Sequence, residues 1–255
     1  MKNILTKIEI DYTTYILIFI ALLAGYIKKI SIIIIILLFH EIGHIICFVL
    51  FKFNIEKIKF YPFGGITVIN KKLHERIYKD ILCSIGGILF QFILFYIYYV
   101  LFKYNLIKNS TYNIFKIYNS SIIIFNLLPI IPLDGSKLLF TICSKYFSYK
   151  NSYVLMIISG ILSLIIFIIY NFIFKLNDII LYIFLITKII EVIKNYKYVI
   201  NKFYLERIIY DNYYDGIINN CHNIKKMKLN KYYYFNENNK YINEKAYLKR
   251  NYLKR

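Results

Sequence analysis

The chain has 255 residues, of which 59% are hydrophobic, and its mean hydropathy is +0.52. Several long apolar runs accompany this composition, which excludes an ordinary soluble domain and is typical of a helical membrane protein. The formal net charge is +19, but 13 of the 33 Lys and Arg residues follow Lys194, and the others cluster at the ends of apolar runs. This placement favours membrane-flanking charge over a nucleic-acid-binding surface, so no nucleic-acid partner is expected.

Six apolar runs meet or approach the length of about 20 residues that a membrane-spanning helix needs. They cover residues 12–27, 31–51, 81–102, 117–133, 153–174 and 178–193. The fold class predicted is therefore an all-α polytopic membrane protein, and an even number of spans puts both termini on one side. The N-terminus and the 52–80 and 134–152 connections carry 12 Lys and Arg residues, against 6 in the opposite loops. By the positive-inside rule both termini are predicted to be cytoplasmic.

The second apolar run contains the stretch LLFHEIGHII, in which two histidines and a glutamate interrupt a lipid-facing pattern. An ionisable group at this depth costs roughly 2.5–3.5 kcal/mol, so something must compensate for it. His40 and His44 lie one turn apart on the same helix face, where two imidazoles can bind one metal ion. Glu41 lies about 60° round the helix from His44. The pattern predicts a hydrolytic zinc centre in which Glu41 is the general base and not a ligand.

The 52–80 connection contains FYPFGGITVIN, where a proline and a glycine pair precede β-branched residues. This is turn and strand chemistry, so a small β-hairpin is predicted between the second and third spans. Non-helical backbone at membrane depth is tolerated only next to protein or a water-filled cavity. The hairpin is therefore a candidate substrate-binding element, through Gly64, Gly65, Ile66 and Thr67. A cytoplasmic hairpin with no special role is the alternative.

A catalytic zinc needs a third protein ligand. Most of the 14 acidic residues flank the spans or lie in the tail, whereas Asp134 is embedded in a mostly apolar segment, FNLLPIIPLDGSKLL. Two prolines interrupt the helix there and Gly135 allows a tight turn, so the carboxylate can be aimed into a bundle interior. We predict one Zn²⁺ per chain, held by His40, His44 and Asp134.

The last 60 residues lose the long apolar runs and gain Asn, Lys and Tyr. The predicted organisation is a transmembrane metalloprotease domain at 1–195 and a short basic, Tyr- and Asn-rich cytoplasmic tail at 196–255. A small appended module, a membrane-surface helix and partial disorder are all compatible with this length. Clustered Lys and Arg beside a membrane favour contact with anionic lipid. The four cysteines show no paired spacing and are predicted to be buried hydrophobic residues.

Three motifs together resemble the site-2 protease family of intramembrane zinc metalloproteases: HEIGH at 40–44, NLLP at 126–129 and LDG at 133–135. The six spans, the PFGG segment and the lack of an inserted PDZ-like domain are similar to the compact sporulation branch, which cleaves a sigma-factor precursor at the membrane. The resemblance covers about residues 10–195. It implies a membrane-associated protein substrate, a membrane-protein inhibitor, and a place in the bacterial cell membrane. It also implies that Asn126, Pro129 and Gly135 shape the site.

Two features depart from that family. In the third span, CSIGGILFQF has Gly87 where a proline is usual, so no role is assigned to Gly86 or Gln91. Relatives in the sporulation branch often carry a C-terminal CBS nucleotide-sensing domain, for which the tail here is too short. Regulation by ATP is therefore not expected to carry over.

The function predicted is cleavage of a peptide bond in or near the membrane segment of another protein. Two other classes use the same metal site. A zinc or proton transporter would need the histidines and Asp134 as pathway ligands, but transporters usually show paired broken segments from an internal repeat. A membrane regulator that has lost catalysis would not need an intact HExxH motif.

Overall fold

The structure is a computed structural model that describes residues 7–61, 64–70, 76–170, 176–210, 214–221, 223–237 and 240–252. The chain divides into two compact units, which are described here separately. The first comprises Met1–Lys71 and Leu82–Asn126, and the second comprises Lys72–Ile81 and Leu127–Arg255.

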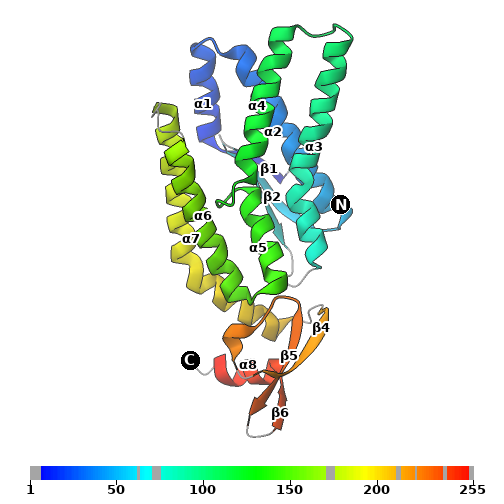
Figure 1. The fold of residues 1–255 in the computed structure, drawn as a ribbon, viewed down its shortest axis with the longest axis vertical. Coiled ribbons are helices and arrows are strands. Elements are labelled where there is room, and N and C mark those ends of the chain that lie inside the picture. The colour runs from blue at the N-terminus through cyan, green and yellow to red at the C-terminus, as the bar shows by residue number, and fades with distance from the viewer. Residues whose placement is uncertain are drawn as a thin grey trace. The chain divides into compact units, whose positions relative to one another are not determined.

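Four helices belong wholly or mainly to the first unit (Figure 1): α1 (Tyr12–Leu23), α2 (Ile27–Leu50), α3 (Ile77–Lys103) and α4 (Asn109–Leu127). Asp11 caps α1, since its carboxylate accepts a hydrogen bond from Thr13 N at 3.0 Å. The packed core combines Ile32 and Ile36 of α2 with Leu94 of α3 and Phe115 of α4.

Two glycines let α2 and α3 approach closely. A Cβ atom at Gly43 would lie 2.8 Å from the carbonyl carbon of Gly86, and a Cβ atom at Gly86 would lie 2.7 Å from Cys47 Sγ. Small residues at a helix contact are the usual way for membrane helices to bring their backbones together. The close approach puts the α3 backbone beside the HEIGH stretch of α2.

A three-stranded sheet completes the first unit, with the strand order β1-β2-β3. β1 (Ile8–Ile10) runs parallel to β2 (Asn54–Tyr61), and β2 runs antiparallel to β3 (Gly64–Asn70). The predicted hairpin is therefore present as β2–β3, although its turn at 62–63 lies outside the described residues. β1 is an addition that the sequence did not suggest.

The second unit contains α5 (Asp134–Tyr146), α6 (Tyr149–Tyr170), α7 (Leu176–Ile209), β4 (Gly216–Cys221), β5 (Lys231–Glu237), β6 (Lys240–Asn243) and α8 (Glu244–Tyr252). A single 3₁₀ turn at Ile224–Lys226 separates β4 from β5. β4 pairs parallel with β5, and β5 pairs antiparallel with β6. Figure 1 shows this sheet and α8 gathered beyond the C-terminal end of α7.

The part of the chain after residue 195 is folded wherever the structure describes it. α7 continues through that position to Ile209, and the sheet and α8 share one apolar core with α6 and α7. Within that core Phe203 stacks on Tyr149 at 4.1 Å, and Phe235 stacks on Tyr247 at 4.0 Å. Aromatic side chains thus give this small module a core that its polar composition conceals.

Three of the described helices are long and apolar enough to cross a membrane: Ile27–Leu50, Ile77–Lys103 and Tyr149–Ile169. They match the second, third and fifth predicted spans, and six spans remain a prediction. The fourth predicted run, 117–133, differs from the structure at both ends. Its helix, α4, begins at Asn109 and ends at Leu127, and the two prolines lie in the irregular segment between α4 and α5.

Candidate metal centre

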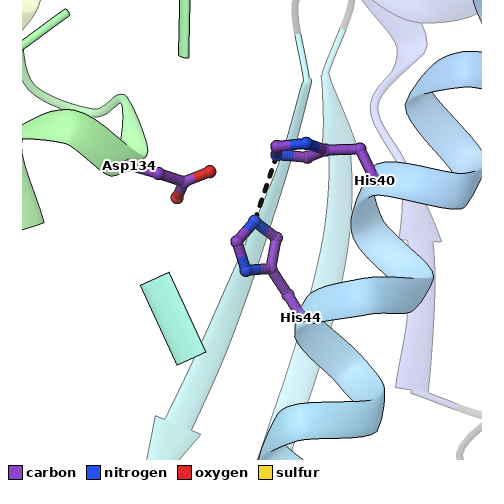
Figure 2. A group of neighbouring side chains, drawn as sticks. All are labelled: His40, His44 and Asp134. Carbon is purple, nitrogen blue, oxygen red and sulfur yellow. Dashed lines mark hydrogen bonds between the residues drawn. The ribbon is translucent and has the colours of Figure 1, made fainter. Parts of the chain in front are cut away.

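The two histidines lie on one face of α2, as their spacing requires, and both are buried. Their Nε2 atoms are 3.1 Å apart, which is the dashed contact in Figure 2. Their Nδ1 atoms point the other way: Nδ1 of His40 is 3.2 Å from Oε1 of Gln91, and Nδ1 of His44 is 2.7 Å from the carbonyl oxygen of Cys83. Each ring is thus oriented by a contact from α3.

These contacts determine where the ring proton of His44 lies. A carbonyl oxygen can only accept a hydrogen bond, so Nδ1 of His44 must carry the hydrogen that bonds to Cys83. In a neutral imidazole Nε2 then has a lone pair, which faces His40. This is the tautomer in which a metal-binding histidine is usually held.

Gly87 of α3 lies directly against the two rings. A Cβ atom there would be 2.5 Å from His44 Nε2 and 2.5 Å from His40 Cε1. Real Cβ atoms do not approach other atoms so closely, so any side chain at this position would displace the rings or the helix. The glycine that departs from the family's usual proline therefore leaves room beside the ligand atoms.

Glu41 is 4% exposed and is held by the hairpin. One oxygen of its carboxylate, Oε1, accepts a hydrogen bond from Gly65 N of β3 at 2.8 Å. A Cβ atom at Gly65 would lie 2.6 Å from the other oxygen, Oε2. The backbone of β3 therefore lies against the carboxylate, at a position where only glycine fits.

Asp134 is the first residue of α5 and is 5% exposed. One of its oxygens, Oδ1, accepts a hydrogen bond from Nζ of Lys137 at 2.9 Å. A Cβ atom at Gly135 would lie 2.5 Å from the carbonyl oxygen of Leu128, so the glycine permits the tight approach before α5. One ligand atom from Asp134 and one from each of the two histidines all lie within 4.8 Å of one another (Figure 2).

The remaining predicted site residues lie on the hairpin and around the prolines. Gly64 has φ +144°, a backbone conformation that side chains rarely adopt. Thr67 of β3 has a buried Oγ1 with no hydrogen-bond partner among the described residues. Ile66 is placed in β3 by its backbone. Asn126 is half-buried in the last turn of α4, and Pro129 is half-buried in the segment that follows.

The sequence did not reveal the contacts that α3 makes with the histidines. A signal for them existed in the four-residue spacing of Cys83, Gly87 and Gln91, which puts these residues on one helix face. That face could not be connected to the histidines without knowing how the two helices pack.

Comparisons with known proteins find similarity over the part of the chain that contains the two histidines. Residues 28–116, which contain His40, Glu41 and His44, match the sequence model of peptidase family M50. This segment is therefore similar to peptidase family M50, the family of the site-2 proteases. It is 31% identical over 151 residues to Stage IV sporulation protein FB of Bacillus subtilis, a match that covers 59% of this chain and 52% of that protein. It is 29% identical over 116 residues to a zinc metalloprotease of Methanocaldococcus jannaschii, covering 44% and 33%.

The fold of this chain also has a solved counterpart. The Site-2 Protease from Methanocaldococcus jannaschii superimposes with a TM-score of 0.55 at 22% identity, covering 72% of this chain and 89% of that one. At this identity the similarity concerns the fold alone. The chain spans about half the length of the sporulation protein and a third of the archaeal metalloprotease. Together this similarity and the three apolar helices indicate an integral membrane protein, and the matched family implies a metal, typically zinc.

Proposed function

We propose that the protein is an intramembrane zinc metalloendopeptidase that cleaves a peptide bond in or near the membrane segment of a membrane-associated protein. The observation that carries the proposal is the pair of Nε2 atoms 3.1 Å apart, with a carboxylate oxygen of Asp134 within 4.8 Å of a ligand atom of each histidine. Burial of three ionisable groups in an apolar bundle is costly, and a shared metal ion offsets that cost.

The donor set fits zinc. Two Zn–N bonds of about 2.0–2.1 Å at a tetrahedral angle place the nitrogens about 3.3–3.4 Å apart, close to the separation in this protein. Two imidazoles and one carboxylate are a common ligand set for catalytic zinc, which keeps its fourth position open for the reaction. The space that a side chain at Gly87 would fill lies beside these ligand atoms.

Zinc bound here would lower the pKa of a water molecule and polarise the scissile carbonyl group. The chain's own residues would supply the remaining steps. Glu41 would take the proton from the attacking water and pass it to the leaving amine. The hydrogen bond from Gly65 N holds one oxygen of this carboxylate and leaves the other for the proton transfer.

The hairpin can bind a substrate in an extended conformation. A helix hides its amide groups in internal hydrogen bonds, so the scissile segment must unwind before it is cut. Among the described residues β3 pairs with a strand on one side only, and its open edge can accept an extended peptide by β-addition. The buried Oγ1 of Thr67, which has no hydrogen-bond partner in the part of the chain that the structure describes, is a further polar group on this strand. We assign substrate binding to Gly64, Gly65, Ile66 and Thr67.

We infer the class of substrate from the resemblance to the sporulation branch. A sigma-factor precursor in a bacterial cell membrane is the substrate that this branch favours, and a membrane-protein inhibitor would restrain the enzyme. Six spans with both termini in the cytoplasm would put the module formed by β4–β6 and α8 on the cytoplasmic side. A membrane-bound anti-sigma factor or a remnant signal peptide is the competing substrate.

The test is cleavage of a panel of single-span substrates by the purified full-length protein in detergent. We expect cleavage that a chelator abolishes and that added zinc restores. The same preparation in liposomes separates the competing class, because a transporter would move zinc across the bilayer and cut nothing. Flux without cleavage would overturn the proposal.

A further inference from the structure

Gln91 is a buried polar residue near the histidines, and the proposed mechanism assigns it no role. It is the single glutamine of the chain, and its side chain is fully buried in α3. A buried carboxamide costs free energy unless its polar atoms are hydrogen-bonded. Its Oε1 is 3.2 Å from Nδ1 of His40, whereas its Nε2 has no hydrogen-bond partner among the described residues.

Gln91 is the last of three α3 positions, four residues apart, that contact the histidines. The carbonyl group of Cys83 holds the ring of His44, Gly87 lies against both rings, and Gln91 contacts the ring of His40. The two imidazoles belong to α2, but the contacts from α3 determine the orientation of their rings.

We propose that Gln91 is a positioning residue whose carboxamide oxygen supplies the acceptor that the zinc-binding tautomer of His40 needs. This inference rests on the metal site of the proposed function. A neutral imidazole carries one ring proton. When Oε1 of Gln91 accepts a hydrogen bond from Nδ1–H of His40, the Nε2 lone pair is presented to the metal. Both histidines then have the same tautomer, because Cys83 imposes it on His44.

The carboxamide can also impose the opposite tautomer. If it rotates by half a turn, its NH₂ group donates to Nδ1 of His40 and the ring proton moves to Nε2. That proton would then be donated to Nε2 of His44, 3.1 Å away, and would block the ligand atom. No other partner of Gln91 Nε2 among the described residues holds the carboxamide in one orientation. The orientation of the Gln91 carboxamide therefore depends on what the Nε2 atoms of His40 and His44 bind.

Three substitutions separate this role from simple packing. Gln91→Met keeps the length of the side chain but removes the acceptor, and Gln91→Glu keeps an acceptor that cannot donate when ionised. Phe92→Leu changes the neighbouring residue, which is 58% exposed, and serves as the control. The zinc affinity of each full-length variant is measured in detergent by competition with a chelator.

We expect Gln91→Met to bind zinc about 10–100-fold more weakly, as happens when a hydrogen bond behind a metal ligand is lost. Gln91→Glu should stay within a few-fold of wild type, and Phe92→Leu should not change the affinity. Wild-type affinity in Gln91→Met, or equal weakening in Gln91→Met and Gln91→Glu, would overturn the inference alone. Failure of the wild type to bind zinc would overturn the proposed function as well.

A spectroscopic readout tests the tautomer itself. The chain has only 4 histidines, so ¹⁵N-histidine labelling gives a short set of ring signals, and the His40→Ala variant identifies the one needed. In zinc-loaded wild type we expect the proton of His40 on Nδ1. After chelation it should move to Nε2 in wild type but stay on Nδ1 in Gln91→Glu. A His40 signal that does not respond to chelation in wild type would contradict the proposal.

Discussion

Glu41 lies next to a metal ligand in sequence, yet its carboxylate is held by the hairpin and not by its own helix. Gln has nearly the same shape as Glu and can still accept the hydrogen bond from Gly65 N, but it cannot take a proton. We therefore expect Glu41→Gln to keep its zinc and to lose cleavage by about 10²–10⁴-fold or more. Single-turnover cleavage, with zinc content measured on the same sample, checks this.

Glu191→Gln is the matched control for this substitution. Glu191 is exposed on α7 and pairs with Lys188 at 2.9 Å, so its loss should leave both cleavage and zinc content unchanged. Undiminished cleavage by Glu41→Gln would show that another group activates the water.

At the same scale, the sequence was informative where a rule links residues close in the chain. Helical periodicity relates His40 to His44, and the cost of an acid in an apolar run singles out Asp134. Gly87 and Gln91 could not be recognised in this way. Their contacts with the histidines depend on the packing of α3 against α2, and nothing in the local sequence encodes that packing.

At the scale of elements, the backbone of β3 approaches Glu41 so closely that a methyl group at Gly65 would collide with the carboxylate. Gly65→Ala should move either the strand or the general base, and we expect cleavage to fall by about 10²-fold, a typical cost of a misplacement of about 1 Å. Zinc content should not change, because the histidines are held by α3.

Val68→Ala provides the control for the strand, since Val68 lies on β3 with its side chain 40% exposed. It should cleave at close to the wild-type rate. Loss of zinc in Gly65→Ala would instead mean that the hairpin supports the metal site, and the assignment of β3 to substrate binding would fail.

The hairpin was predictable because a proline and a glycine pair followed by β-branched residues is a strong local signal. β1 was not, since three residues are too few to show a periodicity and its pairing partner lies more than 40 residues away. The ends of α4 were missed for a related reason. The helix begins in the polar stretch NSTYN, which apolar length alone does not identify.

At the scale of the molecule, one buried ion pair ties the C-terminal module to the end of α7. Arg207 and Glu244 are both fully buried, and the guanidinium donates to both carboxylate oxygens. It also donates to the carbonyl oxygens of Lys228 and Lys231, and Tyr233 N donates to Glu244. The pair therefore joins α7, β5 and α8.

Removing one partner of such a pair leaves a buried charge, at a cost of about 3–5 kcal/mol. Arg207→Met should therefore open the module formed by β4–β6 and α8, which faster amide hydrogen exchange in β5 and α8 would report. Exchange in α2 should stay unchanged. The double variant Arg207→Met with Glu244→Leu should recover protection, and exchange in β5 unaffected by Arg207→Met would contradict the role given to the pair.

The module could not be recognised from the composition of the tail, because polar Asn and Lys are abundant there, while its core comes from alternating aromatic residues. Along β5, Tyr233 and Phe235 are buried and their neighbours are only partly so. That alternation is the signal of a half-buried strand. It is short, and it gives no indication that the strand packs against a helix that extends from the apolar bundle.

The most direct test of the account is the zinc content and X-ray absorption spectrum of the purified full-length protein, compared with Asp134→Asn. The account predicts about one zinc per chain with two imidazoles and an oxygen ligand at about 2.0–2.2 Å, no sulfur ligand, and much weaker binding in Asp134→Asn. A sulfur ligand from any of the four cysteines, or zinc bound equally well by Asp134→Asn, would contradict the metal centre on which the proposed function depends.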